Sequence, residues 1–368
     1  MQVGFELGTT QQFGADSTGG TGGSVAVVNA TPTARSGAYC CKTTMGAGTV
    51  GAGWTTYAGR KHVTHATATE LWYAFGAFFH LAAATTAPGP AFFVTYDPGG
   101  NYNLLLAIDS GTIRGYYCTA NAPTTVGTNA ILIAAASSSL TLDAWHHIDV
   151  RVVASTTTTG TLEVWVDGAR VINATGVRTA QTTASMGSFS LGMTNAPTSQ
   201  GTGHTADYHA FDDLRVNDTT GSVNAGRCGD ESILLMVPTG AGDLTQLSRG
   251  GTDSGANWSQ VDEVPPGSGT DYVTGATVGF TDLYNLTDVT VSTVSALSVW
   301  AQIANPGVGG GSVYLPTKSP AGQSDGSAFA LTAAWTIVGR LLETDPADGL
   351  AWSQAKITAL QAGCKIAS

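Results

Sequence analysis

The stretch from Trp145 to Val171 constrains the fold of this chain more than any other part of the sequence. Within residues 145–153 and 160–166 the apolar residues fall at every second position, a period that is typical of strands with one buried face. Asp167-Gly168 follows and favours a type I′ turn, because glycine accepts the positive φ that this turn needs. The stretch therefore predicts two antiparallel strands and the start of a third.

Similar short segments run through the whole of residues 1–220. They alternate with turn residues at intervals of about eight to twelve positions, and we find no convincing helix among them. The clearest expected strands span residues 70–81, 91–96, 104–108, 113–118 and 130–135. This pattern predicts an all-β fold, an antiparallel jelly-roll sandwich.

A polar, turn-rich segment at 217–222 marks the expected domain boundary, which we place after residue 220. Residues 221–368 are then expected to form a smaller β-rich domain that serves attachment or oligomerisation. Its expected strands span residues 233–237, 289–294, 296–303, 312–315 and 335–342. A short C-terminal helix is expected over 352–363, with Gly363 as its left-handed stop.

Composition excludes several classes of partner. The formal net charge of −11 argues against nucleic acid, because phosphate binding needs clustered Lys and Arg. The sequence has no run of eighteen apolar residues, so we expect no membrane span. The first residues lack a basic region followed by an apolar one, which predicts synthesis in a cytoplasm without a secretory signal.

No motif in the sequence predicts a catalytic centre. Jelly-roll glucanases carry Glu-x-Asp-x-x-Glu on one strand, and this chain has no such spacing, nor a Gly-x-Ser-x-Gly elbow. His146-His147 invites a metal or general-base role, but neighbours on a strand point to opposite faces. We interpret the pair as part of the hairpin architecture, assign no catalytic residue, and expect a protein that is not an enzyme.

Three segments together resemble one known family of domains. They are Gly-Phe-Glu-Leu-Gly at 4–8, Ala-Arg-Ser-Gly-Ala-Tyr-Cys at 34–40, and the closing segment at 211–221. With the block at 145–171 they resemble the laminin-G-like, concanavalin-A-like jelly roll. The resemblance implies a binding or structural sandwich over residues 1–220.

Sugar binding is the function that the resemblance implies most directly. Such a site combines an exposed aromatic platform with Asp or Asn acceptors on loops. The candidates for carbohydrate binding are Tyr96, Asp97, Asn101, Tyr102 and Tyr208. Packing in the core or at an interface explains the same aromatic residues without a ligand, and both interpretations stay open.

Calcium is the one cofactor that the resemblance suggests. Laminin-G-like domains often hold one ion at the rim of the sandwich with Asp carboxylates and backbone carbonyls. Asp97 and Asp207 flank the expected rim loops and are the candidate ligands. The alternative is that each carboxylate caps a turn or faces solvent. No other cofactor is expected.

The second half of the chain resembles a different family. Its segments at 261–266 and 277–284, and the final Asp-Pro-x-x-Gly-x-Ala-Trp-Ser-x-Ala-x-Ile-x-Ala-Leu-Gln-Ala-Gly at 345–363, resemble tailed-bacteriophage virion proteins. The resemblance implies a non-enzymatic structural protein that decorates the head or is associated with the tail or a fibre. We therefore expect a protein of the virion, made in the host cytoplasm.

The expected partners follow from that resemblance. They are further copies of the chain, most plausibly as a trimer, and other phage head or tail proteins. The alternative function is a carbohydrate-binding adhesin on the virion surface that recognises host glycans. Neither alternative involves nucleic acid or a membrane.

Overall fold

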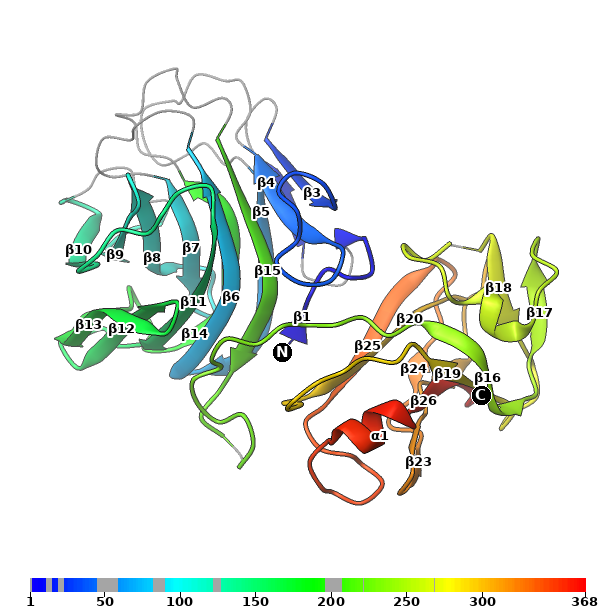
Figure 1. Ribbon diagram of the computed structural model, residues 1–368. Coiled ribbons are helices and arrows are strands. Elements are labelled where there is room, and N and C mark those ends of the chain that lie inside the picture. Colours follow the sequence, from blue (N-terminus) through cyan, green and yellow to red (C-terminus); the bar gives the residue numbers. More distant parts are fainter. Residues whose placement is uncertain are drawn as a thin grey trace. The chain divides into compact units, whose positions relative to one another are not determined.

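Antiparallel strands make up about half of the residues that the computed structural model describes (Figure 1). The structure describes residues 2–10, 15–18, 23–44, 59–81, 90–121, 127–195, 207–220, 222–267 and 269–368. The chain forms two compact units, Met1–Ile233 and Leu234–Ser368. The prediction of an all-β jelly-roll sandwich followed by a smaller β-rich part with a short helix is confirmed.

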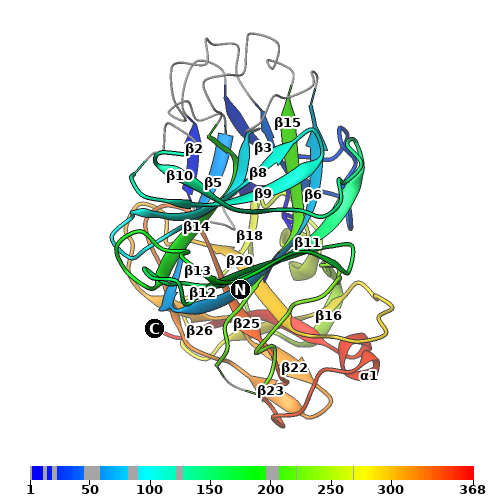
Figure 2. The same ribbon diagram turned by 90° about the vertical axis from the view of Figure 1, so that its left-hand side faces the viewer.

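The first unit is a sandwich of two antiparallel sheets, which both ribbon views show (Figures 1 and 2). The first sheet has the order β13-β12-β11-β6-β15-β4-β3, and β1 joins it beside β15. Its strands are β1 (Gln2–Val3), β3 (Ser24–Val28), β4 (Cys40–Thr44), β6 (Glu70–His80), β11 (Trp145–Val153), β12 (Gly160–Val166), β13 (Ala169–Val177) and β15 (Tyr208–Asn217).

The second sheet has the order β10-β9-β8-β7-β14-β5-β2. Its strands are β2 (Ala15–Thr18), β5 (Gly59–Ala68), β7 (Ala91–Tyr96), β8 (Tyr102–Asp109), β9 (Thr112–Cys118), β10 (Ala130–Ala135) and β14 (Met186–Asn195). Neighbours in space are often remote in sequence, as β5, β14 and β7 are, because the connections cross from one sheet to the other. Residues from several parts of the chain therefore share each face.

The hairpin of β11 and β12 forms as its alternation predicts. Val150 lies opposite Val164, and both are fully buried in the core. Asp167 and Gly168 have φ values of 49° and 84°, the two positive angles of the expected turn. His146 contacts Asp167 at 2.7 Å through Nδ1, so this histidine is part of the hairpin.

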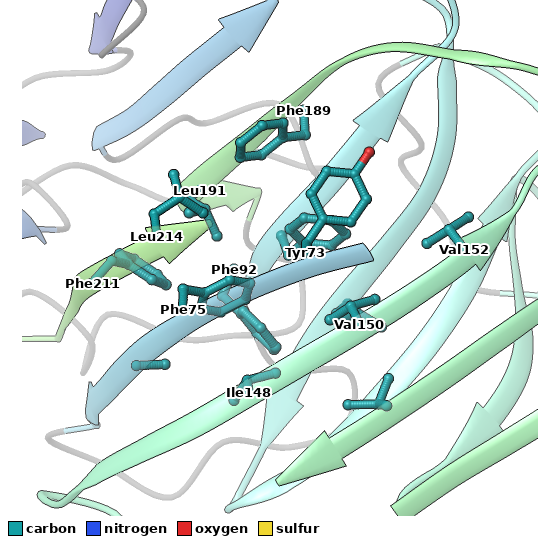
Figure 3. Packing of buried hydrophobic residues seen from close by; sticks show 14 of the residues in the cluster. Tyr73, Phe75, Phe92, Ile148, Val150, Val152, Phe189, Leu191, Phe211 and Leu214 are labelled. Atoms are coloured by element: carbon teal, nitrogen blue, oxygen red, sulfur yellow. The ribbon is translucent and has the colours of Figure 1, made fainter. Parts of the chain in front are cut away.

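Aromatic side chains fill the space between the two sheets (Figure 3). Tyr73 meets Phe189 at 5.1 Å between ring centroids, and Phe75 meets Phe211 at 5.9 Å, both edge to face. This is a favoured geometry for aromatic pairs, and each ring is fully buried or nearly so. The core therefore fixes which face of each strand turns away from it.

A cluster of buried acids lies beneath the turn at 35–38. The carboxylate of Glu6 accepts a hydrogen bond from the Ala38 backbone N–H at 2.8 Å, and burial raises the pKa of Glu6 to about 7. Burial and the neighbouring Asp213 raise the pKa of Asp212 to about 8. At Gly37, with φ at +58°, an added Cβ would lie 2.3 Å from the Glu6 carboxyl.

Residues 222–233 belong to the first unit. The Arg227 side chain donates to Asp149 at 2.8 Å, and the Ile233 backbone N–H donates to Asp213 at 2.7 Å. The first compact unit therefore extends to residue 233, beyond the boundary that the change in composition predicts after residue 220. The attachment role expected for the second domain stays a prediction.

The second unit contains shorter strands. A seven-stranded sheet holds β16 (Pro238–Thr245), β19 (Thr281–Leu286), β21 (Ser312–Tyr314), β22 (Thr317–Ser319), β23 (Gly322–Ser324), β24 (Phe329–Ala330) and β26 (Gln361–Ile366). Two ribbons pair β17 (Ser248–Gly251) with β18 (Asp271–Thr274), and β20 (Leu297–Ile303) with β25 (Thr336–Leu342). The strands expected at 233–237 and 289–294 do not form.

The terminal helix is shorter than predicted. It is α1 (Gln354–Thr358), and the Ser353 hydroxyl caps it by accepting from the Lys356 N–H. Gly363 lies in β26 instead of ending the helix, and it pairs with Leu283 of β19. A Cβ there would lie 1.9 Å from the Asp282 carbonyl oxygen, so this glycine permits close strand approach.

Among the described residues, no helix is both long enough and apolar enough to cross a bilayer.

Candidate functional site

Polar and aromatic side chains lie among buried aliphatic residues, such as Val94 and Leu105, on the face of the second sheet that turns away from the aromatic core. The register places His62 of β5 opposite Ser190 of β14, and Ser190 opposite Val94 of β7. Their neighbours in sequence, such as Val63 and Phe189, point the other way into the core. Strand alternation therefore puts His62 and Ser190 on one surface, although they are far apart in the chain.

His62, Ser190 and Tyr96 form the centre of this surface. The His62 imidazole Nδ1 lies 3.1 Å from the Ser190 hydroxyl oxygen. The imidazole ring also meets the Tyr96 ring edge to face, with 5.2 Å between centroids. Ser190 and Tyr96 are buried whereas His62 is half-buried, so the imidazole is the member of the three that solvent reaches most easily.

The turn between β7 and β8 holds two tyrosines together. Tyr96 and Tyr102 pair across the hairpin, and their rings meet edge to face at 4.8 Å. Asp97 closes the turn, since its carboxylate accepts from the backbone N–H groups of Gly99 and Asn101, each at 2.9 Å. This Asx-type turn orients the tyrosine beside His62.

Hydrogen bonds in and beside that turn stabilise the ionised form of Asp97. Burial opposes its ionisation, but hydrogen bonds from Thr182, Asn101 and Gly99 outweigh burial and hold the pKa of Asp97 below its ordinary value. The Asn101 amide donates to Asp97 at 2.9 Å. Asp97 is therefore an ionised and well-bonded group of the scaffold at neutral pH.

The structure brings four of the five expected carbohydrate-binding residues together. Tyr96, Asp97, Asn101 and Tyr102 lie within or beside the β7–β8 turn. Tyr208 lies on the other sheet, in β15, where it stacks on His80 with 4.8 Å between centroids. Sugar binding at any of the five stays a prediction.

The two expected calcium ligands have separate surroundings. Asp97 is engaged in its own turn, and Asp207 lies fully buried just before β15. In the described ranges, no three His, Cys, Asp or Glu side chains gather in a way that could hold a metal ion. The calcium role of Asp97 and Asp207 stays a prediction.

Sequence reasoning missed His62 and Ser190. Neither residue stands in a recognisable motif, and 128 positions separate them. The signal that the sequence does offer is strand alternation. His62 and Val63 occupy adjacent positions of one strand, so a buried valine implies that the histidine points to the other face. The pairing of β5 with β14 is a property of the topology and could not be read from either segment.

The arrangement suits proton transfer. An imidazole can gain or lose a proton near neutral pH, and a phenol beside it keeps its proton there. The hydrogen bond between the Ser190 hydroxyl and Nδ1 holds the orientation of the imidazole ring, and the hydroxyl can donate to a bare Nδ1 or accept from a protonated one. A half-buried base and a buried acid held side by side are the components of general acid–base catalysis.

Comparison with known proteins gives one family match and several structural similarities. The model of the family described as polysaccharide lyase matches residues 5–206. The endo-β-1,4-glucuronan lyase from the fungus Trichoderma reesei is 19% identical over 57% of this chain and 92% of its own, with a TM-score of 0.41. No match was found among curated proteins.

Two further solved structures are similar to parts of this chain. The cellulose-induced protein Cip1 is 15% identical over 63% of this chain and 100% of its own, with a TM-score of 0.46. The alginate lyase from Aplysia kurodai is 12% identical over 52% of this chain and 86% of its own, with a TM-score of 0.35.

The family match overturns the functional interpretation of the sequence. We expected a non-enzymatic phage virion protein, with a glycan-binding adhesin on the virion as the alternative. Residues 5–206 instead match a family of enzymes, over the same sandwich that the resemblance predicts to be a binding or structural module. The error arose because the interpretation followed the resemblance of the second half of the chain to virion proteins, while a catalytic centre was sought only in sequence motifs.

Proposed function

The chain belongs to the polysaccharide lyase family, and we propose that its first unit cleaves an acidic polysaccharide by elimination at the surface that carries His62 and Tyr96. The match over residues 5–206 carries this proposal, because the matched region contains every strand of the second sheet. A uronate polymer is the appropriate class of substrate, since elimination needs a C–H bond made acidic by a neighbouring carboxyl group.

The reaction requires one base and one acid. The base removes the proton from C5 of the uronate, and the electron pair forms the double bond between C4 and C5. The bond from C4 to the glycosidic oxygen breaks, and the acid protonates that oxygen. The products are a new free end and an unsaturated sugar that absorbs ultraviolet light, and no water is consumed.

We assign the two roles from ordinary side-chain chemistry. His62 is the base, because a neutral imidazole accepts a proton near pH 7. Tyr96 is the acid, because a phenol holds its proton at that pH and can donate it to a developing alkoxide. Ser190 is a positioning residue that acts through the His62 ring, to which it is hydrogen-bonded.

The test is an assay of the purified full chain on polymers of known composition. Glucuronan and alginate are the polyuronate probes, and a neutral β-glucan is the uncharged probe. We expect the ultraviolet absorbance of unsaturated ends to rise with a polyuronate and to stay constant with the glucan. Absence of unsaturated product from every polyuronate tried, over a broad pH range, would refute the proposal.

Variants then test the site. We expect His62→Gln and Tyr96→Phe each to lower kcat by about two orders of magnitude or more. His65→Gln is the matched control, because it makes the same change on the same strand but on a side chain that stacks on Phe189. Full activity of His62→Gln would show that the catalytic site lies elsewhere in the chain, even if the chain proved to be a lyase.

A further inference from the structure

Two tryptophans lie on the outer face of the first sheet, which is the opposite side of the sandwich from His62. Trp72 of β6 and Trp165 of β12 have ring centroids 5.4 Å apart and planes inclined at 32°. Both rings are only half-buried. The core does not need them, because their strand neighbours Tyr73 and Val164 already fill it.

Three guanidinium groups surround the two rings. Arg151 lies 5.4 Å from the Trp72 ring centroid, while Arg227 and Arg170 lie 5.0 and 6.0 Å from that of Trp165. Cation–π attraction holds planar guanidinium groups at such distances. We call these two tryptophans and three arginines the Trp–Arg surface.

The acidic partners of these arginines lie mostly beneath them. The Glu163 side chain is 7% exposed and accepts from Arg151 and Arg170, at 2.8 and 2.7 Å. Asp149 is fully buried and accepts from Arg227 at 2.8 Å. The side chains of the three arginines are 31–45% exposed. Glu70 is 25% exposed and accepts from Arg151 at 2.7 Å, so the layer that meets solvent is aromatic and mostly cationic, although the whole cluster is close to neutral.

The arginines keep donors for a ligand. A guanidinium group has five N–H donors. Within the described residues, Arg170 and Arg227 each place one nitrogen on a carboxylate. The remaining donors lie next to an indole face, so one ligand unit could stack on the ring and present a carboxylate to the guanidinium fork.

We propose that the Trp–Arg surface is a second, non-catalytic binding site for the acidic polysaccharide on which the enzyme acts. In a polyuronate, each unit offers a sugar face that can stack on indole and a carboxylate that matches guanidinium. The identity of the polymer rests on the proposed function, but binding itself does not need the His62 site. A polymer held here keeps its other segments at high local concentration near the opposite sheet.

Binding is tested with the full chain and long polyuronate in affinity electrophoresis. We expect Arg170→Gln and Trp165→Ala each to weaken retention by the polymer about tenfold. Arg249→Gln in the second unit is the charge-matched control and should bind as the wild type does. Thermal unfolding of each variant checks the fold, and Arg170→Gln is the variant that perturbs it least because its side chain is 45% exposed.

Kinetics separates this site from the catalytic one. Arg170→Gln should raise KM for long polymer and leave kcat on short oligouronates unchanged. The His62→Gln variant should bind polymer as tightly as the wild type does. Equal retention of Arg170→Gln and wild type by polyuronate, or equal retention by polyuronate and neutral glucan, would overturn the inference, as would displacement by nucleic acid with higher affinity.

The two proposals fail in distinguishable ways. If the wild type binds polyuronate through Arg170 and Trp165 but forms no unsaturated product, the lyase assignment fails and the surface stands. If it forms product while neither variant changes binding, the surface fails and the lyase stands. If the wild type neither binds nor cleaves any polyuronate, both are wrong.

Discussion

The imidazole of His62 on β5 and the hydroxyl of Ser190 on β14 lie 3.1 Å apart, on adjacent strands of the second sheet. This contact supports the ring, because Ser190 is fully buried and its hydroxyl is hydrogen-bonded to the imidazole. Replacing Ser190 therefore tests the positioning of the His62 imidazole separately from proton transfer.

Ser190→Ala should lower kcat on a polyuronate about tenfold, because the imidazole then loses the partner that holds its orientation. The lower limb of the pH–rate profile should move as well, since the hydrogen bond no longer influences the ring's protonation. Ser188→Ala, on the same face of β14, is the control and should act within about twofold of the wild type. A drop in kcat with an unmoved pH profile would show that Ser190 is merely structural.

Gly37→Ala should lower the free energy of unfolding of the first unit by about 2–4 kcal/mol. The residue has φ at +58°, and the new Cβ would lie 2.3 Å from the Glu6 carboxyl. Gly168→Ala is the comparison, because Gly168 has φ at +84° but no atom within 4 Å of the added carbon. Gly168→Ala should lower the free energy of unfolding, measured with urea, by only about 1 kcal/mol. Equal losses would mean that crowding at Glu6 is unimportant.

The buried carboxyl of Glu6 predicts that stability falls as pH rises. Its folded pKa of about 7 exceeds the ordinary value of 4.5, so the folded chain holds a proton that the unfolded chain releases. The stabilisation is complete below about pH 4.5 and is lost as pH rises through about 7. Urea unfolding across this range should show the decline, and Glu6→Gln should flatten it. A wild-type slope identical to that of Glu6→Gln would contradict the assignment.

His209 predicts the opposite trend at acid pH. Burial lowers the pKa of His209 to about 3, so the folded state holds a neutral ring that the unfolded chain protonates below about pH 6.5. Its contribution to stability is therefore lost as pH falls from 6.5 towards 3. His209→Phe should remove this loss, because the ring packs edge to face on Phe79 at 4.9 Å. We expect this variant to unfold with a free energy about 1 kcal/mol higher at pH 5. Lower stability at pH 5 would indicate an unrecognised partner for the imidazole.

The sandwich was predictable where apolar and polar residues alternate strictly along a strand. Val150, Val164 and the Asp167-Gly168 turn follow from local physics alone, since a period of two and a positive-φ dipeptide specify a hairpin. The second unit was harder because its strands are short and rich in glycine. Gly363 illustrates the difficulty: the same residue type can end a helix or allow two strands to approach, and only the position of Asp282 decides.

The candidate site was predictable only in part. Tyr96, Asp97, Asn101 and Tyr102 are local to one turn, and turn chemistry brings them together. His62 and Ser190 meet because β5 and β14 pair across a long separation. Pairing of that kind depends on the whole topology, so no short segment contains the information.

The place of β15 between β6 and β4 has a consequence for synthesis on the ribosome. β15 spans residues 208–217 and pairs with β1, β4 and β6, all made much earlier. Until it emerges, β4 and β6 each present an open edge that other nascent chains could join. The growing polypeptide therefore passes through a long interval in which chaperone protection matters, and truncation before residue 217 should yield aggregates instead of a smaller soluble sandwich.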